Sequence, residues 1–181
     1  MVGKAITALA ALALLAGCKA QEQSNDAAAG SNNVVRSAEA GTDAGTPVTP
    51  DQAKQLFNER HEGMEKIGKA TKAAGQQLKS SSPDLAVLRS SAATIAELAE
   101  KSGTWFPAGT GKEVNPKTRA KPEIWQKPED FAAKDRDFNT AAKAFKAAAD
   151  SGDMTQINAT FETLGKSCKA CHDTYRAAKH D

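Results

Sequence analysis

The chain has 181 residues, enough for one ordinary domain with a tail or for two very small domains. Its 24 basic and 22 acidic residues give a net charge of +2, and no basic block typical of nucleic-acid binding is visible. The 3 cysteines are too few for a disulfide-stapled scaffold. No apolar run approaches the ~20 residues of a membrane-spanning helix. All aromatic residues lie between Phe57 and Tyr175, so any aromatic core belongs to the C-terminal part of the chain.

The N-terminus has the shape of a secretory signal, because Lys4 is followed by the apolar residues 5–15. The next residues, Leu15-Ala16-Gly17-Cys18, resemble the lipobox of bacterial lipoproteins, in which the cysteine is acylated and becomes the first residue. An ordinary signal with an incidental cysteine is the alternative. We predict a lipoprotein signal peptide over residues 1–17 and a lipid anchor at Cys18, on the periplasmic side of a bacterial membrane.

Residues 19–48 are mostly small, polar or acidic and show no periodicity. Such a composition buries too little apolar surface to offset the entropy of ordering. We therefore expect a lipidated flexible tether over residues 18–48, followed by one folded domain over residues 49–181.

The folded part is predicted to be all-α. Thr49-Pro50-Asp51-Gln52 and Asp153-Met154-Thr155-Gln156 resemble capping boxes, and Ser82-Pro83 suggests that a second helix is capped at Ser82 with Pro83 in its first turn. Apolar residues recur at helical spacing in four stretches, with Phe57, Met64, Ile67, Ala74 and Leu78; Leu85, Leu88, Ala92 and Ile95; Phe131, Phe138 and Phe145; and Ile157, Phe161, Leu164, Cys168 and Tyr175. This pattern predicts an antiparallel four-helix bundle with a long loop over about residues 102–128. A buried planar cofactor would supply the core volume that the alanine-rich helices lack.

The chemical motif is Cys168-Lys169-Ala170-Cys171-His172, the C-x-x-C-H of c-type haem attachment. Two thiols three residues apart on a helix share one face, so both can reach the vinyl groups of one porphyrin. The adjacent imidazole can then bind the iron. A thioredoxin-like site would stand at the start of a helix. A zinc site would need two further ligands, and only His61 and His180 remain.

The segment from Phe161 to Arg176 resembles the last helix of the cytochrome c′ family, the class II cytochromes c. Arg60 and Met64 are similar to that family's first-helix pattern, and Lys121-Pro122-Glu123-Ile124-Trp125 resembles its Pro-x-Ile-Trp sequence. The resemblance covers about residues 51–179. It implies a four-helix bundle around one haem c, bound covalently through Cys168 and Cys171, with His172 as the axial iron ligand.

The resemblance also implies a role for Met64, and two arginines are assigned from the charge that haem propionates need. Met64 is placed on the distal side of the iron, where it either blocks the sixth position or ligates with its sulfur, and we favour blocking. Met154 stands at the start of the fourth helix, too far along it from His172 to compete. Arg60 and Arg176 are the cations assigned to the haem propionates.

We expect a non-enzymatic function: a membrane-tethered periplasmic monohaem cytochrome that transfers electrons to redox partner proteins. The alternative is a five-coordinate haem protein that binds nitric oxide or carbon monoxide, and a thiol oxidoreductase is a third reading. No nucleic-acid partner is expected. Members of the family are often homodimers through their first two helices, so a homodimer is a further state that the resemblance implies.

Overall fold

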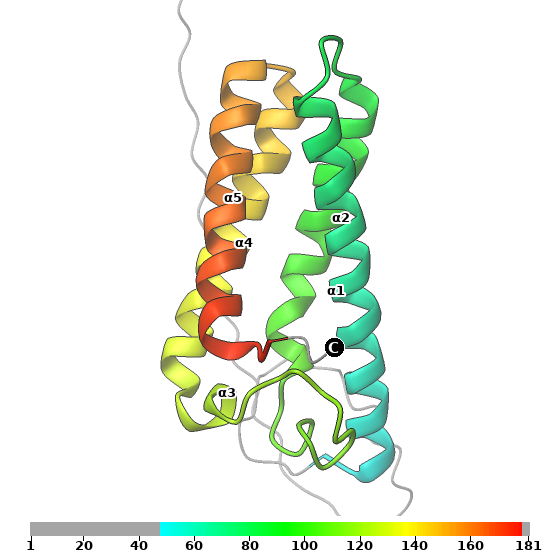
Figure 1. Ribbon diagram of the computed structural model, residues 1–181, viewed down its shortest axis with the longest axis vertical. Helices are drawn as coiled ribbons and strands as arrows, with labels where there is room; N and C mark the ends of the chain where they lie inside the picture. Colours follow the sequence, from blue (N-terminus) through cyan, green and yellow to red (C-terminus); the bar gives the residue numbers. More distant parts are fainter. Residues whose placement is uncertain (1–47, 179–181) are drawn as a thin grey trace, which may run out of the picture. The chain divides into compact units, whose positions relative to one another are not determined.

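A computed structural model describes residues 48–178. The predicted signal peptide, Cys18, nearly all of the tether, and His180 lie outside the described residues. Four long helices form the domain: α1 (Pro50–Leu78), α2 (Leu85–Ser102), α4 (Pro128–Ser151) and α5 (Met154–Tyr175). Figure 1 shows them as a bundle in which the start of α1 and the end of α5 lie at the same end. The predicted antiparallel four-helix bundle is confirmed.

The predicted N-cap residues agree with the structure for two of the three helices, α1 and α5. Thr49 Oγ1 accepts the backbone N–H of Gln52, and Gln52 Oε1 accepts the backbone N–H of Thr49, as in a capping box. Asp153 caps α5 by accepting the backbone N–H groups of Thr155 and Gln156.

The cap predicted for the second helix is wrong by two residues. Helix α2 begins after Asp84, whose carboxylate accepts the backbone N–H groups of Ala86 and Val87, so Ser82 and Pro83 stand outside the helix. Serine followed by proline and aspartate offers two overlapping starts. The charged cap prevails because a carboxylate accepts two N–H groups at the positive end of the helix dipole.

The helices pack in the order α1 on α2, α2 on α4 and α4 on α5. Their interface contains the apolar residues that the helical spacing predicted, including the fully buried Leu88, Ile95, Phe145, Ile157 and Leu164. Burial of one such side chain contributes roughly 1.5–3 kcal/mol. Many of the other buried positions are alanines, whose small side chains let the helices pack closely.

The long connection between α2 and α4 contains a 3₁₀ turn, η1 (Gly103–Trp105), and a short helix, α3 (Glu123–Gln126). Neither was expected from the sequence. Trp105 is buried against α1 at Gly63, and Trp125 donates its indole N–H to the carbonyls of Phe106 and Pro107 at 3.0 Å each. These contacts fold the connection onto the open end of the bundle. Within residues 48–178, no helix combines the length and the apolar character needed to cross a membrane.

Candidate functional site

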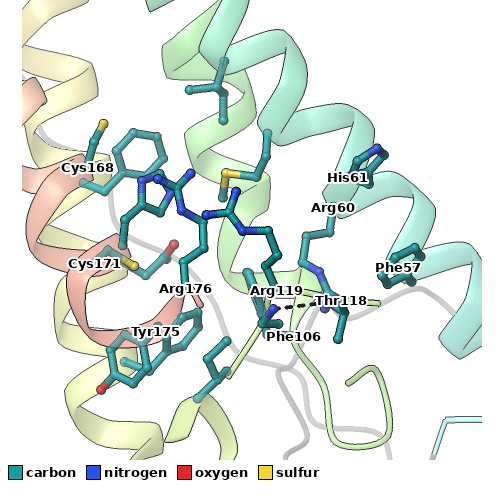
Figure 2. A pocket seen from close by; sticks show the side chains of 18 of the residues that line it. Phe57, Arg60, His61, Phe106, Thr118, Arg119, Cys168, Cys171, Tyr175 and Arg176 are labelled. Carbon is teal, nitrogen blue, oxygen red and sulfur yellow. Dashed lines mark hydrogen bonds between the residues drawn. The ribbon is translucent and has the colours of Figure 1, made fainter. Parts of the chain in front are cut away.

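A cavity of about 670 Å³ lies between α1, α4, α5 and the long connection. Its wall contains every site residue predicted from the sequence within the described part of the chain: Arg60, Met64, Cys168, Cys171, His172 and Arg176. Figure 2 shows Cys168 and Cys171 on α5 at one side of this cavity and Arg60 on α1 at the other. Residues more than 100 positions apart in the chain therefore meet here, because α1 and α5 flank the same opening.

The two thiols occupy the same face of α5, close to its C-terminal end. Neither forms a disulfide, and both are half-buried. Burial raises the pKa of Cys168, and burial together with the nearby Asp135 raises the pKa of Cys171 to about 11. Both thiols are protonated at neutral pH, which is the opposite of the activated thiolate that a thiol oxidoreductase needs.

His172 is half-buried beside the thiols. Burial, and then the positive charges of Arg176 and Arg119, lower its pKa below the ordinary value. The imidazole is therefore neutral at neutral pH, the form that binds iron. The axial role of His172 stays a prediction.

The opposite wall comes from α1. Met64 is half-buried and packs against the core, and Ile67 lies one turn further along. Arg60, one turn before Met64, is 6% exposed. Its guanidinium donates to the Trp105 carbonyl at 3.1 Å and to the Thr110 carbonyl at 2.8 Å.

Two aromatic rings also hold the Arg60 side chain. The guanidinium carbon lies 4.9 Å from the ring centre of Phe106 and 5.2 Å from that of Phe57. Burial lowers the pKa of Arg60 to about 10, which leaves it charged at neutral pH. Arg60 thus ties α1 to the long connection and places a positive charge on the cavity wall. Its contact with a haem propionate stays a prediction.

The sequence reasoning missed Arg119, which reaches the cavity from the long connection. Residues 119–121 lie against the end of α5 through an isolated bridge between Ala120 and Arg176. The Ala177 N–H donates to the Arg119 carbonyl at 2.8 Å, and the Lys121 N–H donates to the Tyr175 carbonyl at 3.0 Å. No local sequence pattern predicts the pairing of residues 119–121 with the end of α5. The bonded residues are about 55 positions apart and belong to no regular strand.

The aromatic lining was missed as well. Phe131 meets Phe106 and Tyr175 edge to face, with ring centres 4.8 Å and 5.2 Å apart. Tyr175 also donates its hydroxyl to Asp130. The spacing of Phe131 predicts a core position, and in the structure Phe131 lines the cavity.

A sequence model of the family described as Cytochrome C' matches residues 55–176, a span that includes the whole cavity wall. This chain belongs to the cytochrome c′ family. The cytochrome c′ of Alcaligenes xylosoxydans xylosoxydans is 41% identical over 75 residues, which cover 41% of this chain and 57% of that relative. The match therefore spans little more than half of that relative's length. The cytochrome c′ of Pararhodospirillum photometricum is 34% identical over 117 residues, covering 65% of this chain and 92% of the relative.

Solved structures agree with the sequence matches. The cytochrome c′ of Thermochromatium tepidum superposes with a TM-score of 0.66 at 32% identity, over 74% of this chain and 100% of that one. A ferrous variant of the cytochrome c′ from Alcaligenes xylosoxidans, solved with bound NO, gives a TM-score of 0.62 at 27% identity over the same shares.

The cavity of this cytochrome c′ fits the family's haem c. Both thiols of C-x-x-C-H face it, and its walls carry Met64, Ile67, Phe106 and Phe138. Positive side chains stand at its edge, where a macrocycle that carries two carboxylates needs partners. One haem c is bound covalently through Cys168 and Cys171.

Proposed function

We propose that this cytochrome c′ is a periplasmic, lipid-anchored monohaem electron carrier and not an enzyme. The observation that supports it most directly is the meeting, in one cavity, of the two thiols and the neutral His172 on α5 with Met64 on α1. Bound haem supplies one-electron exchange between ferric and ferrous iron. The protein supplies the attachment, an axial imidazole and an apolar surrounding.

Each group has a distinct task in this proposal. Cys168 and Cys171 would hold the haem through thioethers, and His172 would supply the imidazole that binds its iron. Arg60 and Arg176 would neutralise the propionates. The hydrogen bonds of Arg60 to Trp105 and Thr110 fix its guanidinium before any cofactor binds, which reduces the entropy lost on pairing.

Binding of a small gas is the second candidate, and the position of Met64 favours it. Met64 is half-buried against the core, so its side chain is held on the cavity wall rather than free in solvent. A thioether in that place would crowd the open side of a bound haem iron and leave room only for small neutral ligands. The NO bound to the relative from Alcaligenes xylosoxidans supports the same chemistry. We infer that Met64 blocks the iron rather than ligating it.

Absorption spectra of the purified protein in both oxidation states, with and without carbon monoxide, test the proposal. C-type haem with reversible reduction is expected, and a protein without covalent haem refutes it. Met64→Ala should speed carbon monoxide binding. The matched control is Met154→Ala, the same change at the first residue of α5, some 27 Å along the helix from His172 at ~1.5 Å per residue. A thioether-to-iron charge-transfer band that only Met64→Ala removes would refute blocking and make the protein an electron carrier in which Met64 ligates the iron.

The location and partners follow from the sequence outside the described residues. An acylated Cys18 would hold the domain on the periplasmic side of a bacterial membrane, and the tether would let it meet redox partner proteins. A homodimer is part of the proposal, because another cytochrome c′ of this fold shows a ligand-controlled dissociation of its dimer. Sedimentation with and without carbon monoxide tests that part.

A further inference from the structure

One titratable group in the cavity has no part in the function proposed above. Asp135 projects from α4 into the cavity wall and is half-buried. Its carboxyl group lies against Ser102 at the end of α2 and against Asn139, one turn further along α4. A Cβ atom added at Gly103 would meet its Oδ2 atom at 3.0 Å, so the carboxyl is closely enclosed on that side.

The hydrogen bonds around Asp135 can accommodate a protonated carboxyl group. Ser102 is 1% exposed, and its Oγ lies 2.7 Å from the Ala99 carbonyl and within hydrogen-bond distance of Asp135 Oδ1. One hydroxyl has one proton, so it cannot donate to both acceptors. If Asp135 is ionised, the Ala99 carbonyl loses this donor. If Oδ1 carries a proton, it donates to Ser102, and Ser102 donates to Ala99.

The second carboxyl oxygen of Asp135 keeps its hydrogen bond whether the group is ionised or protonated. The Asn139 side-chain amide donates to Asp135 Oδ2 at 3.2 Å, a bond that a carbonyl-type oxygen accepts as readily as a carboxylate. The proton can therefore come and go at Oδ1 while the side chains stay in place. Only the direction of the Ser102 hydroxyl changes.

The charges near Asp135 do little to hold it ionised. Burial raises its pKa, against the hydrogen bond from Ser102 and the neighbouring Arg136. From α5, Cys171 is close enough for Asp135 to raise the thiol pKa, and this is a thiol that carries the haem. The next residue, His172, lines the cavity from the same helix. The other charged or titratable groups on the wall are Arg60, His61, Glu65, Lys117, Arg119, Cys168, Tyr175 and Arg176.

We propose that Asp135 is the proton acceptor that couples haem reduction to uptake of one proton. An external one-electron donor reduces ferric to ferrous haem, and a proton from water forms an O–H bond at Asp135 Oδ1. The added electron removes one positive charge from the cavity, so the carboxylate loses attraction and protonation becomes more favourable. The coupling rests on the redox function proposed above.

A redox titration of the haem-loaded protein between pH 5 and pH 9 tests this coupling. At a fixed electrode potential, the ratio of ferrous to ferric protein should change with pH, by at most tenfold per unit, which is 59 mV for one electron. Asp135→Asn should remove the pH dependence of the reduction potential over this pH range. The amide imitates the protonated acid and can donate to Ser102. The wild type and Asp135→Asn should coincide at the acid end.

The matched control is Asp137→Asn, which removes the same charge from an exposed position on α4. It should keep the wild-type slope. A pH-independent wild type, a slope that survives in Asp135→Asn, or a slope lost equally in Asp137→Asn overturns the proposal. A haem that cannot be cycled between its two states overturns the redox function too, whereas reversible cycling at a constant potential overturns only the proton coupling.

A second measurement uses the wild-type protein alone, in case Asp135→Asn does not take up haem. Infrared difference spectra of reduced minus oxidised protein should contain a carboxylic acid C=O band that shifts in D₂O and on ¹³C labelling of aspartate. The band of a haem propionate would not shift on ¹³C labelling of aspartate. Absence of the aspartate band overturns the proposal.

Discussion

Gly63 allows α1 to approach Trp105, and replacing it by alanine tests how closely the two pack. A Cβ atom at Gly63 would lie 2.4 Å from the Trp105 Cη2 atom and 2.8 Å from Cζ2. Carbon atoms in contact prefer about 3.5–4.0 Å, so the helix or the indole would have to move by roughly 1 Å. Trp105 is 3% exposed and cannot swing into solvent. Overpacking of this kind costs about 1–3 kcal/mol.

Gly68 provides the matched control on the same helix. It is exposed, and a Cβ atom added there would meet nothing within 4 Å. Each Gly→Ala change gains about 0.5–1 kcal/mol of helix stability. This gain cancels when Gly63→Ala is compared with Gly68→Ala. The difference between the two free energies of unfolding should therefore report the clash alone, about 1–3 kcal/mol.

Guanidinium denaturation of the haem-loaded variants, followed by far-UV circular dichroism, measures this difference. Gly68→Ala should be more stable than the wild type. Gly63→Ala should be the less stable of the two variants and should unfold at a lower guanidinium concentration. Its carbon monoxide kinetics should also change, because Met64 follows Gly63 directly on the cavity wall. Equal stability of the two variants would refute the close approach of α1 to Trp105.

Three further predictions concern the cofactor, the anchor and acid stability. Cys168→Ala should weaken covalent haem attachment and lower the helix content; a haem-free double variant with Cys171→Ala that melts like the wild type would contradict the idea that haem fills the core. Cys18→Ser should release the protein from membranes with an unchanged haem spectrum, and continued sedimentation with membranes at high salt would contradict the lipid anchor. Backbone N–H bonds from Gln156 and Thr155 and the Gln156 amide lower the pKa of Asp153, so its stabilising effect is present above the ordinary value of 3.8 and is lost as the pH falls through the lower, folded-state pKa. The guanidinium midpoints of wild type and Asp153→Ala should accordingly differ less at pH 2 than at pH 7. An equal difference at both pH values would show that the carboxylate is not the cause.

Signals contained within one turn or one helix were readable from the sequence. Cys168, Cys171 and His172 lie within five residues, so their spacing alone places them on one helix face. The capping box at Thr49, the cap at Asp153 and the apolar stripes of the four long helices depend on neighbours two to four positions away. Helical geometry relates these residues directly, which is why the bundle and the haem motif could be predicted.

Contacts between distant segments were decided only by the tertiary structure. Arg60 meets the Trp105 and Thr110 carbonyls, Arg119 reaches the end of α5, and Ser102 meets Asp135 from another helix. These pairs have no fixed spacing, because their meeting depends on how the long connection folds across the open end of the bundle. The sequence therefore determined which helix carries the haem, through the local geometry of C-x-x-C-H. The polar groups that surround the cofactor were set by packing between elements, and no periodicity along the chain records that packing.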